Sequence, residues 1–126
     1  MQKLLNTGFG KIIHTEINHN RLNFRVELNP QHEIYTGHFP HRPITPGVCS
    51  LQMIRELLET HFQQKLQLRK ADNIKFSGMI DPQQMKEVSF IITILSEPIS
   101  DNIIVKASIE ASEHIFCKFS GEYFRV

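Results

Sequence analysis

Apolar and polar residues alternate in several segments of the chain, which is typical of half-buried β-strands. In RLNFRVEL, which begins at Arg21, every second residue is apolar and the residues between are polar or charged. The turn-like stretches IDPQQ and EPISDN separate later segments of the same kind. We expect strands at 21–28 (RLNFRVEL), 86–95 (KEVSFIITIL), 102–111 (NIIVKASIEA) and, from its aromatic residues, 114–126 (HIFCKFSGEYFRV).

Between the first and second of these strands, the apolar positions follow a helical period. The helix is predicted to begin near Gly47 and to run to about Lys65, with Thr45 as a cap and Pro46 where a first turn tolerates proline. The apolar stripe predicted to pack on the sheet comprises Leu51, Ile54, Leu57, Leu58 and Phe62. The opposite side, expected to face water, comprises Gln52, Arg55, Glu56, Glu59 and Thr60.

This order of elements predicts an α+β fold, with an antiparallel sheet packed on a single helix, in one domain spanning residues 1–126. The formal net charge of +1 provides no long-range field for binding nucleic acid. No apolar run approaches the length of a membrane span, and the first residues lack the apolar core of a signal peptide. Two cysteines, Cys49 and Cys117, do not make a disulfide framework, so a cytoplasmic location is the simplest expectation.

The loop before the helix, GHFPHRPITPGV at 37–48, contains three prolines. Each proline restricts its own φ angle and disfavours helical conformation in the residue before it, so the loop is expected to be stiff. It ends at a helix N-terminus, where free N–H groups carry partial positive charge. Gly47 has no side chain and would let a ligand oxygen approach its amide. The loop therefore places His38 and an oxyanion-type donor at the two ends of a rigid span.

This loop resembles the signature of the hotdog-fold 3-hydroxyacyl-(acyl carrier protein) dehydratases, H-F-P-G-x-P-x-x-P-G-V. That signature is followed, four residues after its valine, by a glutamate or, in a sister branch, an aspartate. The resemblance extends more loosely from about Leu22 to Val126: NIKFSGMIDPQQMKEVSF at 73–90 is similar to the family's strand–turn–strand after the helix, in which a phenylalanine precedes a proline-containing turn. The chain lacks the N-terminal LPHR of the housekeeping enzymes. The residues that match the signature at the same spacing are His38, Phe39, Pro40, Pro43, Pro46, Gly47 and Val48.

The resemblance implies a curved antiparallel sheet around one long helix, in a dimer or trimer of dimers whose sites lie at subunit interfaces. The implied reaction converts a 3-hydroxyacyl thioester on acyl carrier protein to a trans-2-enoyl thioester, in fatty-acid or related lipid or polyene biosynthesis. His38 would remove the α-proton, and the amide of Gly47 would hold the thioester carbonyl. Phe39, Pro46 and Val48 would belong to the substrate-binding site. No metal or organic cofactor is implied.

The sequence departs from the signature at two positions. His41 replaces the small residue after H-F-P; it forms an H-x-x-H pair with His38, but no third ligand at metal-binding spacing accompanies the pair. The acid position is occupied by Gln52, whose amide cannot supply a proton at neutral pH. Glu56 follows four residues later, on the same predicted helix face, so the acid and the amide of the usual E-x-x-x-Q pattern have exchanged places.

Several interpretations follow from this exchange. Glu56 would act as the acid from one turn away, or Gln52 would orient a water while His38 carries the proton. Alternatively, the chain would bind acyl thioesters without turnover, as a subunit that depends on an active partner, or it would be a hotdog thioesterase. A basic cluster of Lys65, Arg69, Lys70 and Lys75 is either a docking patch for the acidic carrier protein or a solvated loop after the helix.

Overall fold

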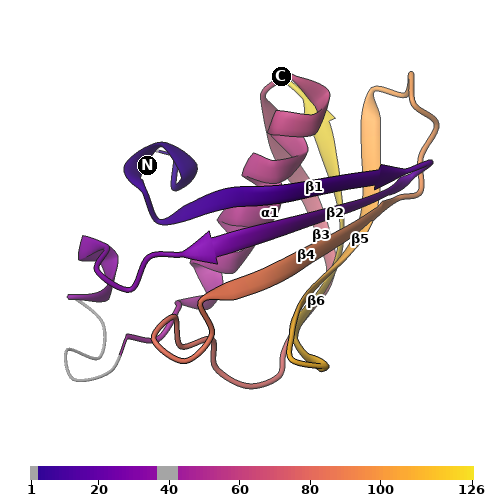
Figure 1. Ribbon diagram of the computed structural model, residues 1–126. Helices are drawn as coiled ribbons and strands as arrows, with labels where there is room; N and C mark the ends of the chain where they lie inside the picture. The colour runs from indigo at the N-terminus through magenta and orange to yellow at the C-terminus, as the bar shows by residue number, and fades with distance from the viewer. Residues whose placement is uncertain (1–2, 37–42) are drawn as a thin grey trace.

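The computed structural model describes residues 3–36 and 43–126 and shows a curved six-stranded antiparallel sheet with one long helix on its inner face (Figure 1). The strand order is β1-β2-β4-β5-β6-β3, so β1 and β3 form the two edges. The elements in chain order are η1 (Leu5–Thr7), β1 (Gly10–Asn18), β2 (Arg21–Leu28), η2 (Glu33–Tyr35), α1 (Gly47–Phe62), β3 (Leu66–Phe76), β4 (Glu87–Ile94), β5 (Asn102–Ala111) and β6 (His114–Arg125). This is the arrangement that the resemblance implies.

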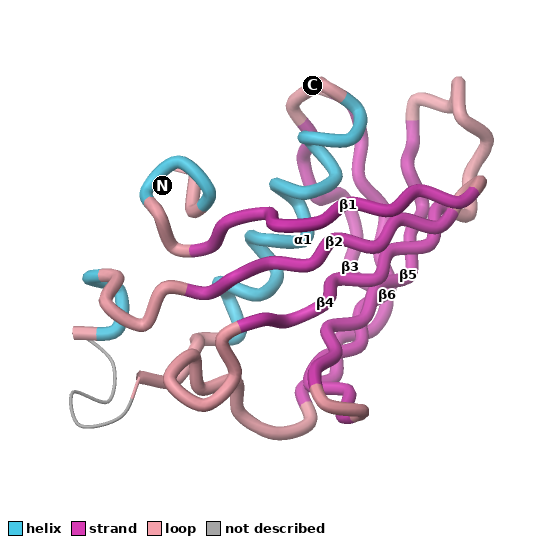
Figure 2. Tube along the Cα trace, viewed as in Figure 1, coloured by secondary structure: helices cyan, strands magenta, loops and turns pink. Residues whose placement is uncertain are grey.

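The alternating segments form the middle of the sheet, as predicted. Their apolar positions are in register: Phe24 of β2 lies opposite Phe90 of β4, which lies opposite Ile109 of β5. All three side chains are buried. The helix α1 crosses one face of the sheet (Figure 2). Matching rows of apolar residues on neighbouring strands therefore build one side of the core, and the polar residues between them lie on the outer face.

Helix α1 begins at Gly47, as predicted, but its N-terminal and C-terminal details differ from the prediction. Pro46 is the N-cap residue, and no side chain caps the helix. The prediction that Thr45 caps the helix is wrong, because its hydroxyl is hydrogen-bonded to the hydroxyl of Tyr35 instead, at 3.0 Å. The helix ends at Phe62, three residues before the predicted end, where Gln63 turns the chain with a left-handed φ of 54°.

The predicted exposure of the polar side of α1 is wrong for two residues. Ile54, Leu57 and Leu58 pack into the core as expected, but Glu56 and Glu59 are also buried, at 1% and 7% exposure. A buried carboxylate is stable only when donors replace its water. Those donors come from segments on either side of the helix: the N-terminal residues supply them to Glu56, and the start of β3 supplies one to Glu59.

The two edge strands were not predicted from the alternation of residues. Segment 66–76 is strand β3 and pairs with β6 along its whole length, so the loop considered for its basic residues is wrong, and the strand that the resemblance implies at its end is confirmed. Irregularities in this pairing between Leu68 and Lys70 and between Ala71 and Asn73 break the period of two. β1 is likewise interrupted between Ile12 and His14. Among the residues of β3, only Leu66 is buried, so the outer edge of this strand is open in the single chain.

Candidate functional site

The first two turns of α1 carry most of the predicted site residues that the structure describes. Pro46 and Gly47 are half-buried at the helix start, and Val48 is 62% exposed. Gln52 and Glu56 follow on the same face of the helix. Other predicted residues of the signature loop, His38, Phe39 and His41, lie outside the described residues.

The N-terminus of α1 presents two free backbone donors. The N–H groups of Cys49 and Ser50 both bond to the carbonyl of Pro46, at 3.0 and 3.4 Å. Among the described residues, the N–H groups of Gly47 and Val48 have no hydrogen-bond acceptor. Unbonded amides at a helix N-terminus favour an oxygen that carries negative charge, such as a thioester carbonyl as it gains enolate character.

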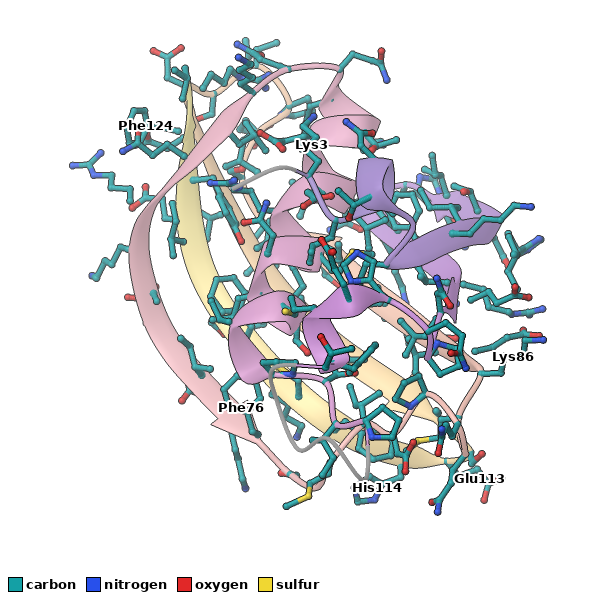
Figure 3. The ribbon with its side chains drawn as sticks, turned by 90° about the vertical axis from the view of Figure 1, so that its left-hand side faces the viewer. Lys3, Phe76, Lys86, Glu113, His114 and Phe124 are labelled. Carbon is teal, nitrogen blue, oxygen red and sulfur yellow. The ribbon has the colours of Figure 1, made fainter. Side chains whose placement is uncertain are left out.

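A pocket of about 230 Å³ lies beside this end of the helix, between the loop before α1 and the ends of β3 and β6. Phe76, at the end of β3, lies against the helix start (Figure 3): a Cβ atom added at Gly47 would lie 2.7 Å from the tip of its ring. The ring is 48% exposed, and Met79 nearby is 60% exposed, so apolar side chains form part of the pocket's wall and rim. The lining residues are Ile44, Thr45, Gly47, Ser50, Phe76, Gly78, Met79, Ile80, Phe116 and Cys117.

The segment that leads into the helix is anchored at Thr45. Its backbone N–H donates to the carbonyl of Ile80 at 2.9 Å, and its hydroxyl is 3.0 Å from the hydroxyl of Tyr35. Burial raises the pKa of Tyr35 to about 12, so the residue remains a neutral phenol throughout the physiological range. The hydrogen bond between Tyr35 and Thr45 therefore joins the described segment before residue 37 to the described segment after residue 42.

The two cysteines are buried and free. Cys117 borders the pocket, and Cys49 lies in the first turn of α1. Burial raises the pKa of both thiols. A thiol with a raised pKa is protonated at neutral pH and is a poor nucleophile, so neither cysteine has the properties of a catalytic thiolate.

The side chains of Gln52 and Glu56 are hydrogen-bonded to each other. Nε2 of Gln52 donates to Oε2 of Glu56 at 2.8 Å. The same oxygen accepts the backbone N–H of Leu4 at 2.8 Å, and Oε1 accepts the N–H of Leu5 at 2.9 Å. The carboxylate of Glu56 thus holds the N-terminal turn and the amide of Gln52 together, in a position with almost no contact with water.

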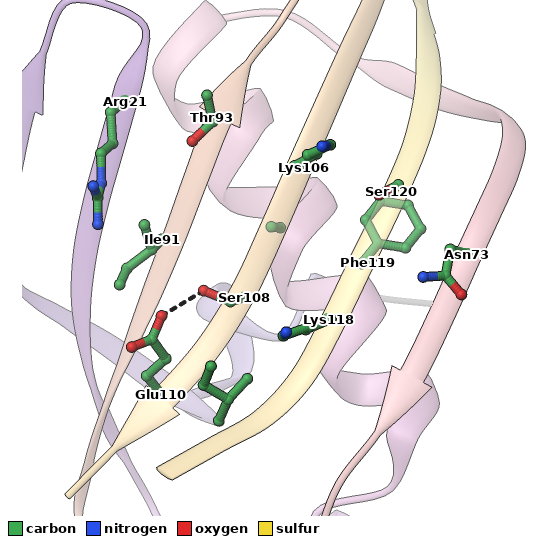
Figure 4. A pocket seen from close by; sticks show the side chains of 12 residues that line it. Arg21, Asn73, Ile91, Thr93, Lys106, Ser108, Glu110, Lys118, Phe119 and Ser120 are labelled. Carbon is green, nitrogen blue, oxygen red and sulfur yellow. Dashed lines mark hydrogen bonds between the residues drawn. The ribbon is translucent and has the colours of Figure 1, made fainter. Parts of the chain in front are cut away.

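A larger hollow of about 480 Å³ lies on the outer face of the sheet, away from α1 (Figure 4). Arg21, Lys106 and Lys118 border it, and Glu110 there accepts a hydrogen bond from Ser108 at 2.7 Å. None of the predicted site residues that the structure describes lines this hollow. The basic cluster predicted from the sequence lies elsewhere, on and before β3, where Lys70 is paired with Asp72 at 3.2 Å.

No group of three or more potential metal ligands occurs within residues 3–36 and 43–126. In the same residues, no helix is both long and apolar enough to cross a membrane.

Comparison with known proteins places these features in a family. The family model for ApeI dehydratases, ApeI-like, matches residues 14–117, which is most of the chain. The chain belongs to the ApeI-like dehydratase family. A comparison with curated protein sequences gives no significant match.

Solved structures share the fold of this ApeI-like chain. The dehydratase heterocomplex ApeI:P from Xenorhabdus doucetiae aligns with a TM-score of 0.68 at 16% identity, over 92% of this chain and 98% of that one. A putative thioesterase from Lactococcus lactis aligns with a TM-score of 0.66 at 9% identity, over 99% and 98%. A hypothetical thioesterase with coenzyme A from Streptococcus pneumoniae aligns with a TM-score of 0.66 at 6% identity, over 93% and 85%. The predicted hotdog fold is therefore confirmed.

Two features of the site were not found from the sequence. The contact of Phe76 with Gly47 was missed because it depends on where the end of β3 lies relative to the helix start, which the sequence pattern does not show. The contact between Tyr35 and Thr45 was missed because it joins the two sides of the loop. The apolar residues at the end of the basic segment, Ile74 and Phe76, were the available signal that this segment packs against something.

Proposed function

We propose that this ApeI-like protein dehydrates 3-hydroxyacyl thioesters carried by acyl carrier protein to trans-2-enoyl thioesters. The observation that carries the proposal is the helix start, directly after the histidine loop: Gly47, whose N–H is free as is that of Val48, lines a largely apolar pocket. A thioester carbonyl suits such donors, and an acyl chain suits the apolar wall formed in part by Phe76 and Met79. The two buried thiols are compatible with a reducing, cytoplasmic location.

The proposed reaction needs one proton transfer in each direction. His38 takes the α-proton, and the electron pair of that C–H bond forms the new carbon–carbon double bond. The bond between C3 and its hydroxyl breaks, and the hydroxyl leaves as water after receiving a proton from the imidazolium of His38. The amide of Gly47 stabilises the negative charge on the thioester oxygen between these events. Gln52 holds the hydroxyl, or a water next to it, by a hydrogen bond.

Glu56 is a poor candidate for the acid in this scheme. Its two oxygens already accept two backbone N–H groups and the amide of Gln52. Its side chain is also 1% exposed, which separates it from a substrate that enters from solvent. These contacts favour proton transfer by His38 over an acid at Glu56.

The proposed enzyme works as a dimer formed along β3. Five apolar residues of β3 lie opposite residues of β6 that are mostly buried, so they share the face of the sheet that carries the core. They are Leu66, Leu68, Ala71, Ile74 and Phe76. The five positions are spaced symmetrically about Ala71. If two copies of β3 paired antiparallel with Ala71 at the two-fold axis, Leu68 of one copy would lie opposite Ile74 of the other. Such pairing would bury side chains that are 40% exposed and would satisfy an open strand edge.

Light scattering with two matched variants tests the dimer. Ile74→Lys should shift the protein toward the monomer, because it places a charge in the proposed interface. Ile99→Lys changes a residue that is 94% exposed in the turn before β5 and should leave the dimer intact. A wild-type monomer at micromolar concentration, or a dimer that Ile74→Lys does not weaken, would contradict the proposed interface.

A second candidate is a binding subunit that depends on an active partner. The amide at the acid position, committed to Glu56, is the observation that favours it. The similar protein from Xenorhabdus doucetiae is part of a dehydratase heterocomplex, ApeI:P, which gives a precedent for such a partner. A thioesterase is a further alternative within the same fold, as the Lactococcus and Streptococcus structures indicate.

One set of assays separates these candidates. The purified protein is given 3-hydroxyacyl- and crotonyl-acyl carrier protein, and both enoyl formation or hydration and free thiol release are measured. We expect interconversion without thiol release, and its loss in His38→Ala but not in His14→Ala, a change of an exposed histidine on β1. Thiol release would indicate a thioesterase. Full activity of His38→Ala, or binding of acyl carrier protein without turnover, would overturn the proposed function.

A further inference from the structure

The carboxylate of Glu56 determines which way the amide of Gln52 points. Backbone N–H groups can only donate, so both oxygens of Glu56 must act as acceptors toward Leu4 and Leu5. The third contact, at 2.8 Å, must then come from a donor, which is Nε2 of Gln52. Oε1 of Gln52 is left on the other side of the amide, and it has no hydrogen-bond donor among the described residues. Gln52 is half-buried, whereas Glu56 is buried.

We propose that Glu56 is a positioning residue that fixes the amide of Gln52 so that Oε1 faces the reacting group as a hydrogen-bond acceptor. This inference rests on the proposed function. A substrate hydroxyl that donates its hydrogen to Oε1 keeps its lone pairs free, and one of them can receive the proton that converts the hydroxyl to water. An amide turned the other way would donate to those lone pairs and compete with that proton.

The exchange of acid and amide along the helix therefore has a chemical consequence. A carboxylate at position 52 would present acceptor oxygens in either orientation. An amide does so only if a neighbour selects one orientation, and a buried carboxylate with two backbone donors of its own makes that selection. Glu56 thus acts through Gln52 and does not touch the substrate.

A purely structural role for Glu56, as an anchor of the N-terminal turn, makes a different prediction. In that case, loss of Glu56 would lower turnover only by lowering the stability of the fold. Any other substitution that lowers stability equally would then lower turnover equally. The positioning role predicts an effect on turnover through the orientation of one amide. Glu56→Gln distinguishes the two, because Nε2 of the new glutamine can donate to Oε1 of Gln52 and reverse its amide.

The kinetic test compares Glu56→Gln with two matched controls under conditions in which all variants are folded. We expect kcat to fall about 10- to 100-fold with little change in KM, the scale typical of a misplaced group. Glu59→Gln makes the same substitution at the other buried carboxylate of α1, and Leu4→Ala loosens the N-terminal turn without changing Glu56. Both controls should keep kcat. Equal losses of kcat in all three variants, or an unchanged kcat in Glu56→Gln, would overturn the positioning role.

Restoring an acceptor provides a rescue. In the double variant Gln52→Glu/Glu56→Gln, the carboxylate at position 52 again presents acceptor oxygens, and the amide at position 56 can donate to it. We expect the double variant to recover much of the kcat that Glu56→Gln loses. A double variant as slow as Glu56→Gln would contradict the requirement for an acceptor at this position.

A measurement without turnover separates this inference from the proposed function. The side-chain amide protons of Gln52, followed by NMR, should shift in Glu56→Gln but not in Glu59→Gln, and should shift again when a 3-hydroxybutyryl-pantetheine thioester binds the wild type. An inactive wild type that shows both shifts would overturn dehydration but leave the positioning contact in place. An amide signal that does not respond to Glu56→Gln would overturn the positioning role even in an active enzyme.

Discussion

Glu56 and Glu59 lie three residues apart on α1, and both are buried, yet their surroundings differ. Glu56 accepts three hydrogen bonds, two from the N-terminal turn and one from Gln52. Glu59 accepts one, from the N–H of Leu66 at 2.9 Å; its Oε1 has no hydrogen bond among the described residues, and Nζ of Lys3 lies 3.8 Å away. Burial of a carboxylate therefore does not by itself reveal its role; the donors around it do.

The difference in donors suggests a difference in purpose. Glu59 joins the end of the helix to the first residue of β3, which is a local connection over seven residues. Glu56 joins the helix to Leu4 and Leu5, which are remote in the sequence. It also holds the side chain of Gln52, at the family's acid position. The first contact is sufficiently explained by folding, whereas the second also orients a group in the candidate site.

The largest expected effect on stability is that of Glu56→Ala. Removal of the carboxylate leaves the N–H groups of Leu4 and Leu5 without an acceptor, and each buried unsatisfied donor costs about 1–3 kcal/mol. We expect the free energy of unfolding to fall by about 2–6 kcal/mol, measured by urea denaturation. Thr60→Ala, an exposed change on the same helix, serves as the control. A loss no greater than that of Thr60→Ala would show that the N-terminal turn does not depend on Glu56.

Glu59→Ala should have a smaller effect, because only the N–H of Leu66 loses its acceptor. The expected loss is about 1–3 kcal/mol by the same measurement. Lys3→Ala removes a partner that is 46% exposed and should change stability by at most about 1 kcal/mol. If Glu59→Ala were as damaging as Glu56→Ala, the number of hydrogen bonds would not explain the difference between the two carboxylates.

The smallest expected effect concerns the pKa of Tyr123. Burial raises this pKa most, Arg55 lowers it, and the charge of Glu59 raises it further. Glu59→Gln should therefore lower the pKa of Tyr123, and Glu56→Gln should leave it unchanged. Alkaline titration of phenolate absorbance in a Tyr35→Phe background isolates Tyr123, because the chain has two tyrosines. Equal responses to the two substitutions would contradict the assignment.

The sign of the pH dependence follows from the same burial. Both tyrosines have a higher pKa in the folded protein than the value of about 10 that is usual in an unfolded chain. Their contribution to stability is therefore fully present below pH about 10 and is lost as the pH rises above that value. Stability that stayed constant up to pH about 12 would contradict the raised pKa values.

Local pattern was enough to predict the middle of the sheet and the helix. β2 and β5 coincide with the predicted segments, and β4 differs by one residue at each end. Apolar residues at every second position dictate a strand with one buried face, wherever its neighbours lie. The proline-rich loop and Gly47 likewise indicated the family before any contact was known. For the predicted site residues on α1, the sequence did not indicate the hydrogen bonds that join Gln52 to Glu56 and Glu56 to the N-terminal turn.

Contacts between distant segments decided the rest. β3 lacks a clear alternation because its pairing with β6 is irregular at two places, so its inner face becomes visible only beside that strand. The position of Phe76 against Gly47 depends on how β3 returns to the helix start. Glu56 reads as a surface residue of an amphipathic helix until the N-terminal turn covers it. The sequence by itself thus determined which segments are strands and helix where one face of each meets a regular core. The tertiary structure alone decided the two edges of the sheet and the burial of Glu56, because the partners of these groups come from remote parts of the chain.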